Sequence, residues 1–194
     1  MMKKIVIIMS IIALFTLVLS VPVQARELER GNEKNSLNSS LLIKSPMRID
    51  EKVCEYLKTV KENYEEEILE SKTVQSFAAA PPLTYLQVYA VISSQHPTYE
   101  YFSENQLSSV EDHGGDEMYI VTIEIGYGHL RFAKMNGSLL NSVQSQPIDL
   151  DNDSIIDGWF YWWDASGYDS GDFTYQNTSS NYPWNTMSDF IHIK

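Results

Sequence analysis

Short segments with alternating residue character dominate the second half of the chain, and they constrain its fold most. Between Leu83 and Ile92, and again between Met118 and Tyr127, apolar side chains recur at every second position. This period of two is typical of β-strands, because successive side chains of a strand point to opposite faces of a sheet. No helical periodicity separates the segments, so the sequence predicts an all-β module over residues 81–194.

Further strand signals are spaced as in a sandwich. The dipeptide Asn136-Gly137 separates two of them, and it is the preferred centre of a type I′ hairpin turn. We expect about seven to nine strands in an antiparallel β-sandwich of jelly-roll-like or Greek-key topology. The additional predicted strands cover residues 99–103, 131–135, 138–143, 155–163, 172–177 and 190–194.

An amphipathic helix is expected ahead of this module, over residues 46–70. Ser45-Pro46 favours a helix start, since proline is common in the first turn. Within the helix, Lys61 and Glu65 are four residues apart and can pair across one turn. Two interpretations are open: a helix packed on the β-module, or a removable pro-segment or docking helix for a partner. The apolar residues, at helical spacing, are Ile49, Val53, Tyr56, Leu57, Val60, Tyr64 and Ile68.

The chain begins with the features of a secretory signal peptide. Two early lysines precede an apolar run that ends at Val21, and Val23-Gln24-Ala25 provides a small-residue cleavage site. We therefore expect residues 1–25 to be removed and the mature protein to be secreted and extracellular, without a stable membrane anchor. Residues 26–80 then form a linker and the helix.

Charge balance and cysteine count limit the possible partners and the sources of rigidity. The chain has 14 Lys and Arg against 26 Asp and Glu, and loss of Lys3 and Lys4 changes its formal charge from −12 to −14. So acidic a protein is repelled by polyanions, and we expect no nucleic-acid partner. The single cysteine, Cys54, cannot form a disulfide within the chain. Rigidity must then come from the core or from a metal.

The chemically most informative stretch is D-L-D-N-D-S-I-I-D at residues 149–157. Its four aspartates have the spacing of positions 1, 3, 5 and 9 of a calcium loop, with a backbone carbonyl available at position 7. Clustered carboxylates repel one another, and a divalent cation turns that repulsion into attraction. The sequence therefore predicts a Ca²⁺ site. Its predicted ligands are Asp149, Asp151, Asp153, Ile155 and Asp157.

Two residues depart from the usual calcium loop. Ser154 stands at position 6, where glycine is preferred, and Phe160 stands at position 12, where a bidentate glutamate is usual. We therefore expect weak binding, suited to extracellular calcium. The alternative is a solvated turn whose Asp and Asn side chains accept hydrogen bonds from their own backbone.

All four tryptophans lie in the last third of the chain, among other aromatic residues. In a secreted β-module this favours a carbohydrate-binding or cell-surface-binding site, because flat rings stack on sugar faces. The alternative is core packing, since consecutive rings of one strand face opposite ways and one set must be buried. The predicted binding residues are Trp159, Trp162, Trp163, Tyr168 and Trp184.

A second acidic cluster occupies residues 111–117 and contains His113. Together with Asp164 it is a candidate acid/base site for a hydrolase. No G-x-S-x-G or H-E-x-x-H motif accompanies it. We therefore favour a non-enzymatic module and keep the hydrolase as a second alternative.

Six short motifs carry a resemblance to a known family. They are L-T-Y-L-Q-V-Y-A-V at 83–91, I-G-Y-G at 125–128, F-A-K-M-N-G at 132–137, D-G-W-F-Y-W-W-D-A-S-G-Y at 157–168, F-T-Y-Q-N-T-S at 173–179 and P-W-N-T-M-S at 183–188. With these motifs the β-module resembles the YolA-like family, small secreted proteins of Gram-positive bacilli with a domain of unknown function. The resemblance implies export and a β-rich fold, and it implies no catalytic residue.

Overall fold

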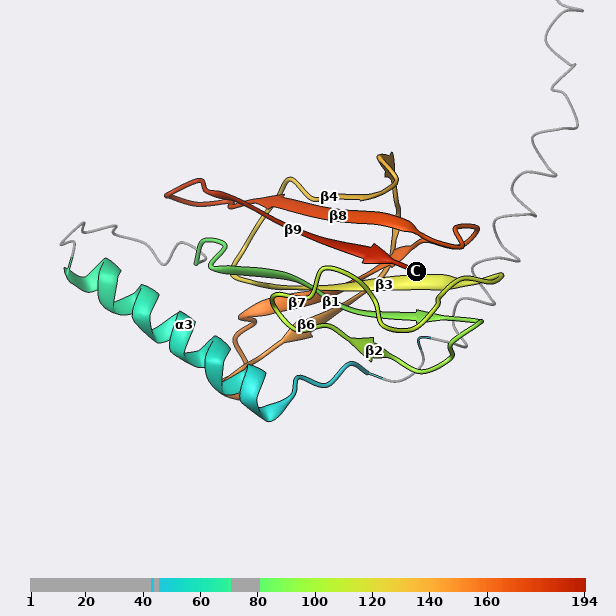
Figure 1. Ribbon diagram of the computed structural model, residues 1–194. Coiled ribbons are helices and arrows are strands. Elements are labelled where there is room, and N and C mark those ends of the chain that lie inside the picture. The colour runs from blue at the N-terminus through green and yellow to red at the C-terminus, as the bar shows by residue number, and fades with distance from the viewer. Residues whose placement is uncertain (1–42, 44–45, 71–80) are drawn as a thin grey trace, which may run out of the picture. The chain divides into compact units, whose positions relative to one another are not determined.

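The computed structural model describes residues 43, 46–70 and 81–194, which contain one helix and nine strands (Figure 1). The strands form two antiparallel sheets, so the predicted all-β sandwich preceded by one helix is confirmed. The predicted signal peptide and most of the predicted linker lie outside the described residues. The elements are α3 (Glu51–Glu70), β1 (Tyr85–Ser93), β2 (Glu100–Tyr101), β3 (Met118–Ile125), β4 (Phe132–Met135), β5 (Ser138–Leu139), β6 (Ser142–Ile148), β7 (Gly158–Asp164), β8 (Gly171–Thr178) and β9 (Thr186–Ile193).

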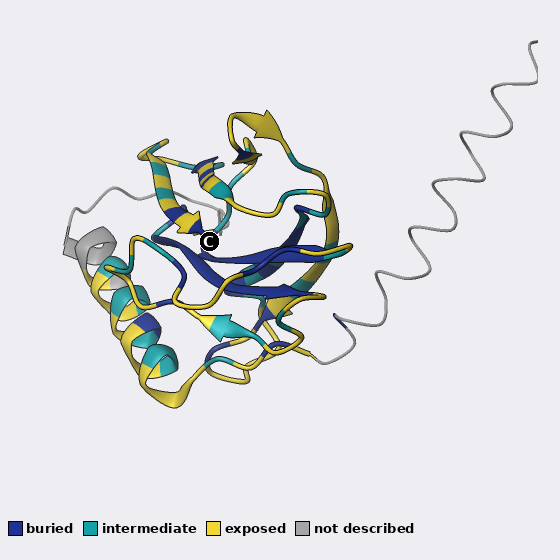
Figure 2. Ribbon diagram, turned by 45° about the vertical axis from the view of Figure 1, so that its right-hand side comes forward, coloured by how far each residue is buried: buried dark blue, intermediate teal, exposed yellow. Residues whose placement is uncertain are grey.

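The two sheets differ in how much of their surface is buried. The first has the strand order β2-β1-β3-β7-β6 and the second β5-β4-β8-β9. Strands β1 and β3 are buried along their whole length (Figure 2). In contrast, exposed and buried residues alternate along β4 and β8. The central strands of the five-stranded sheet are therefore covered on both faces, whereas the four-stranded sheet has one face in solvent.

Two apolar cores account for this difference. One lies between the sheets and includes Trp163, Phe173 and Tyr175. The other lies on the opposite face of the five-stranded sheet, where Leu57 of α3 packs with residues such as Tyr89 of β1. The helix therefore packs on the β-module, whereas its removal as a pro-segment stays a prediction. Helix α3 covers a sheet face that would otherwise expose apolar side chains.

The helix begins at Glu51, five residues later than predicted. Asp50 caps it: its Oδ1 accepts a hydrogen bond of 2.9 Å from the N–H of Lys52. The preceding segment is tied to β6 instead, because the backbone N–H and C=O of Met47 both bond to the Gln146 side chain, each at 2.9 Å. The predicted helix start at residue 46 was wrong. Pro46 favours a helix start, but Asp50 caps the helix and Met47 is held by Gln146 instead.

A β-bulge interrupts the strict alternation of side chains that the sequence predicts for β1. The pairing with β3 shifts register between Val88 and Ala90, so Tyr89 is an extra residue. As a result Val88 and Val91 face the core between the sheets, whereas Tyr89, Ala90 and Ile92 face the core under α3. A strict period of two would have placed Val88 and Ala90 on the same face.

The predicted hairpin is present, but the strand after it is divided. Asn136 (φ 50°) and Gly137 (φ 81°) both have positive φ, as a type I′ turn requires. The strand predicted over residues 138–143 ends at Leu139, and the chain then crosses to the other sheet as β6, which begins at Ser142. This crossing places the end of β6, and the acidic loop after it, beside α3.

Candidate functional site

The loop between β6 and β7 brings three of the four predicted aspartates together. Carboxylate oxygens of Asp149, Asp151 and Asp153 all lie within 4.8 Å of one another, and the three residues are exposed. Oxygens that share one Ca²⁺ at its usual bond lengths lie no more than about 5.2 Å apart. The cluster has the dimensions of a cation site.

Backbone N–H groups fix the position of these carboxylates. Asp149 accepts hydrogen bonds from the N–H groups of Asp153 (3.2 Å) and Ser154 (3.0 Å). Ser154 has φ 71°, the left-handed conformation for which position 6 of a calcium loop prefers glycine. The loop therefore follows the expected backbone course in spite of the serine.

The same loop contains the hydrogen bonds of an ordinary Asx turn. The N–H of Asp153 donates to Asp151 Oδ1 (3.3 Å), and the N–H of Ile155 donates to Asp153 Oδ1 (2.7 Å). Each joins a side chain to the backbone two residues later, which is the pattern of the alternative interpretation. Calcium binding at this cluster, including any ligand from the Ile155 carbonyl, stays a prediction.

The fourth aspartate, Asp157, has a different environment. It is 4% exposed, and its Oδ2 accepts a hydrogen bond of 2.7 Å from the N–H of Leu150. Its Oδ1 lies 2.7 Å from Nζ of Lys61 on α3, and this ammonium also lies 2.9 Å from Asp151 Oδ2. A lysine of the protein itself thus neutralises part of the charge that the sequence analysis assigned to a metal.

The pKa values of this contact shift as expected for an ion pair. Burial alone lowers the pKa of Lys61, but its hydrogen bonds to Asp157 and Asp151 outweigh burial and raise that pKa above its usual value. The hydrogen bond from Lys61 in turn lowers the pKa of Asp151. Both groups are therefore charged over the physiological pH range, and α3 is linked electrostatically to the loop.

Two of the three predicted binding tryptophans on β7 are core residues. Trp162 is fully buried in the core under α3, and its Nε1 donates to the Tyr99 hydroxyl at 2.9 Å. Trp163 is 5% exposed between the sheets, and its Nε1 donates to Thr122 Oγ1 at 2.9 Å. Covered rings cannot stack on a surface ligand, so the predicted platform loses these two members.

The other three predicted aromatic residues reach the surface to different degrees. Trp159 and Tyr168 are half-buried. Trp184 is 60% exposed in the turn between β8 and β9, where Tyr182 is 67% exposed. The exposed aromatic surface predicted from the sequence is therefore concentrated in this turn.

The predicted acid/base cluster is organised around a buried histidine. His113 is 2% exposed; its Nδ1 lies 3.3 Å from Ser93 Oγ and its Nε2 lies 3.1 Å from Glu100 Oε2. Serine, histidine and carboxylate in this order make up a hydrolytic relay. However, Ser93 is fully buried, and its hydroxyl also accepts the N–H of His96 at 3.0 Å. A substrate cannot reach that hydroxyl, so the arrangement serves to fix the loop.

The surroundings of the Glu100 carboxylate favour its charged form. Burial raises its pKa, but the N–H groups of Val110 (2.7 Å) and Glu111 (3.0 Å) together with His113 lower it further than burial raises it. Neither Ser93 nor Glu100 was singled out from the sequence. They come from separate segments that only the folded sheet places beside His113.

The acidic residues of the predicted cluster lie elsewhere. Glu111, Asp112 and Asp116 are exposed. Burial, and the nearby charges of Asp164 and Asp116, raise the pKa of Glu117. Asp164 accepts a hydrogen bond of 3.0 Å from the N–H of Ser166. Carboxylates of the predicted hydrolase site therefore lie close enough to interact, but His113 bonds to Glu100 instead.

A buried ionic network between the sheets was not predicted. Glu124 of β3 is fully buried; it forms an ion pair with Arg131 and accepts hydrogen bonds from the Tyr175 hydroxyl (3.0 Å) and the Asn177 amide. The Arg131 guanidinium also lies 4.7 Å from the centre of the Tyr161 ring. The network joins β3, β8 and the segment before β4, and all of its members are protein groups. We assign it a structural role.

Comparison with known proteins identifies a domain. The model of a family described as "Domain of unknown function (DUF4879)" matches residues 78–193, which is more than half of the chain and includes all nine strands. No curated protein matches the sequence. The resemblance to the YolA-like family is not tested by this match and stays a prediction. Within the described residues, no helix is long and apolar enough to cross a membrane.

Proposed function

Because this chain belongs to the DUF4879 family, a domain of unknown function, we propose a role from its geometry: an exported, non-enzymatic β-sandwich module whose acidic loop binds calcium. The observation that supports calcium is the approach of the carboxylate oxygens of Asp149, Asp151 and Asp153 to within 4.8 Å of one another. Export is proposed from the apolar run and small-residue cleavage site within residues 1–25.

Calcium stabilises the module in this proposal. The loop connects β6 to β7, and a hydrogen bond of 2.7 Å from the N–H of Leu150 to Asp157 Oδ2 joins its two ends. A ligand that binds the folded state alone stabilises it by about 2.7 kcal/mol when its concentration is a hundred times its dissociation constant. Extracellular calcium is abundant enough to occupy even a weak site. Nucleic acid is not a partner, because the chain is strongly acidic.

Thermal unfolding with calcium and with a chelator tests the proposal. We expect a higher melting temperature in millimolar calcium than in EDTA. Asp149→Asn and Asp153→Asn should each remove most of that difference, because asparagine keeps an acceptor for the backbone N–H groups but loses the charge. Asp116→Asn, at an exposed aspartate outside the loop, should keep the full difference. Equal melting temperatures in calcium and EDTA would rule out the metal.

A second candidate is an extracellular carbohydrate-binding or cell-surface-binding module. The exposed Trp184 and Tyr182 in the turn between β8 and β9 support it, because exposed rings provide stacking surfaces. Since Trp162 and Trp163 are buried, a ligand should change mainly the fluorescence of Trp184. A polysaccharide that binds the wild type should change its tryptophan fluorescence, and this change should be absent in Trp184→Phe. A wild-type spectrum that no cell-surface polysaccharide alters would count against this candidate.

The hydrolase alternative receives less support from the geometry. The hydroxyl beside the histidine of its acidic cluster, Ser93 next to His113, is fully buried. We propose no catalytic residue.

A further inference from the structure

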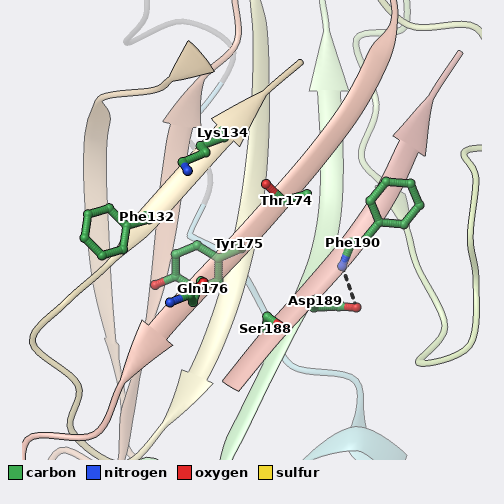
Figure 3. A pocket seen from close by; sticks show the side chains of 8 residues that line it. All are labelled: Phe132, Lys134, Thr174, Tyr175, Gln176, Ser188, Asp189 and Phe190. Atoms are coloured by element: carbon green, nitrogen blue, oxygen red, sulfur yellow. Dashed lines mark hydrogen bonds between the residues drawn. The ribbon is translucent and has the colours of Figure 1, made fainter. Parts of the chain in front are cut away.

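An open pocket of about 670 Å³ lies on the solvent face of the four-stranded sheet (Figure 3). It is separate from the acidic loop, because it is built from β4, β8 and β9. Phe132 and Phe190 are 41% and 39% exposed, so both residues present apolar surface to solvent. The pocket is lined by Phe132, Lys134, Thr174, Tyr175, Gln176, Ser188, Asp189 and Phe190.

Strand register arranges the exposed lining residues in two rows. Phe132 pairs with Gln176, which pairs with Ser188. In the neighbouring row Lys134 pairs with Thr174, which pairs with Phe190. Strand spacing and rise then put the two phenylalanine Cα atoms, at opposite corners, roughly 12 Å apart. Two apolar rings thus flank a polar floor.

Two common kinds of peptide ligand do not fit this floor. Strand β8 runs along the middle of the pocket, and its backbone groups are already paired with β4 on one side and β9 on the other. An extended peptide that adds a strand to this sheet would pair with the outer edge of β9, beside the pocket and not over its floor. An amphipathic helix needs an apolar groove, whereas Thr174, Gln176 and Ser188 make this floor polar. The pocket must recognise its ligand through side chains.

The charges of the pocket balance and so favour a neutral ligand, because its lining contains one ammonium, Lys134, and one carboxylate, Asp189. Both oxygens of Asp189 are occupied, Oδ2 by the N–H of Val88 (2.6 Å) and Oδ1 by the N–H of Phe190 (2.8 Å). Lys134 forms no ion pair with any described carboxylate, so its ammonium is free to donate. The whole chain has a formal charge of −12, which repels polyanions at long range.

We propose that this pocket binds a neutral oligosaccharide. Apolar faces of the sugar rings pack against Phe132 and Phe190, while the ring hydroxyls exchange hydrogen bonds with Lys134, Thr174 and Gln176. The assignment rests on the second candidate function above and moves its binding surface from the tryptophans to β4, β8 and β9. It does not depend on calcium.

Calorimetric titration of the full mature chain, in EDTA, tests the assignment. The neutral probes are gluco-, manno-, xylo- and galacto-oligosaccharides. Oligogalacturonate is the acidic counterpart of the galacto-oligosaccharide. We expect at least one neutral oligosaccharide to bind more tightly than oligogalacturonate. Phe132→Ala and Phe190→Ala should each weaken binding about tenfold or more, as expected for loss of an aromatic anchor. Val143→Ala, at a similarly exposed apolar side chain on β6, is the matched control and should bind normally.

The outcomes separate the site from the function. Binding that is lost in Trp184→Ala but unchanged in the two phenylalanine variants would overturn the assignment to this pocket and keep carbohydrate binding as the function. Tighter binding of oligogalacturonate than of every neutral sugar would overturn the neutral ligand. No binding of any neutral oligosaccharide at millimolar concentration would overturn both the assignment and the second candidate function.

Discussion

Individual charged residues carry much of the chemistry of this protein, and the buried Glu124 is the clearest case. A carboxylate removed from water is tolerated only when it is paired and hydrogen-bonded, and Glu124 has Arg131, Tyr175 and Asn177 as partners. The sequence contains no sign of this network. Glu124 falls inside an apolar strand segment, and its partners come from distant positions in the chain.

We expect Glu124→Gln to destabilise the protein by about 3–5 kcal/mol, because it leaves the Arg131 charge uncompensated beside a buried neutral side chain. The free energy of unfolding in urea is the measurement. Glu62→Gln, at an exposed glutamate of α3, should change stability by less than about 0.5 kcal/mol. Equal urea midpoints for Glu124→Gln and the wild type would show that the network does not stabilise the fold.

Glu100 should make the stability depend on acidic pH. Its folded-state pKa is lowered, so its contribution is present above the unfolded pKa of about 4.5 and is lost as the pH falls through the folded value. In Glu100→Gln, stability should therefore fall less steeply between pH 5 and 3 than in the wild type, as measured by urea midpoints across that range. The prediction fails if the two pH profiles are parallel.

At the scale of the elements, ion pairs of Lys61 link α3 to the acidic loop. Helical spacing predicts a pair of Lys61 with Glu65, whose side chain lies outside the described part of the structure, and it gave no sign that Lys61 contacts Asp151 and Asp157. Helical spacing identifies neighbours within a helix but cannot identify which loop packs beside it. The same limit explains the β1 bulge, since register depends on packing against β3 and not on the β1 sequence alone.

We expect Lys61→Met to lower the melting temperature in EDTA and to increase calcium affinity severalfold. The first effect follows because the aspartates lose their only described cationic partner, and the second because a positive charge no longer repels calcium near Asp151. The raised pKa of Lys61 means that its own contribution is fully present below about pH 10.5 and is lost only above that pH.

Lys52→Met is the matched control for this variant, because Lys52 is an exposed lysine of the same helix. It should leave both the melting temperature in EDTA and the calcium affinity unchanged. Calcium affinity that is equal in Lys61→Met and the wild type would show that helix and metal do not compete for Asp151.

At the scale of the whole molecule, the two-sheet architecture was predictable from the sequence, but the burial of each sheet face was not. Period-two segments, the Asn-Gly turn and the absence of intervening helices were enough to predict an antiparallel sandwich. Alternation could not show that the first sheet is buried on both faces, because a strand with two apolar faces loses the polar half of the pattern. The acidic loop could be located from its spacing, but its lysine partner and the pocket on β4, β8 and β9 depend on tertiary contacts.

We expect the exported protein to retain residues 46–70. Removing α3 would expose the core face of the sheet that includes Tyr89 and Trp162, and an exposed apolar face of that size promotes aggregation. The intact mass of protein purified from culture medium tests this expectation. A mass that corresponds to a chain starting near residue 81 would instead support a removable pro-segment.

The central claim is that Asp149, Asp151 and Asp153 hold one calcium ion. Its most direct test is isothermal titration of the chelator-treated chain with calcium, beside the Asp149→Asn, Asp153→Asn double variant. The account predicts one site per chain in the wild type and none in the double variant. No binding heat in the wild type up to millimolar calcium, or equal binding in both proteins, would contradict it.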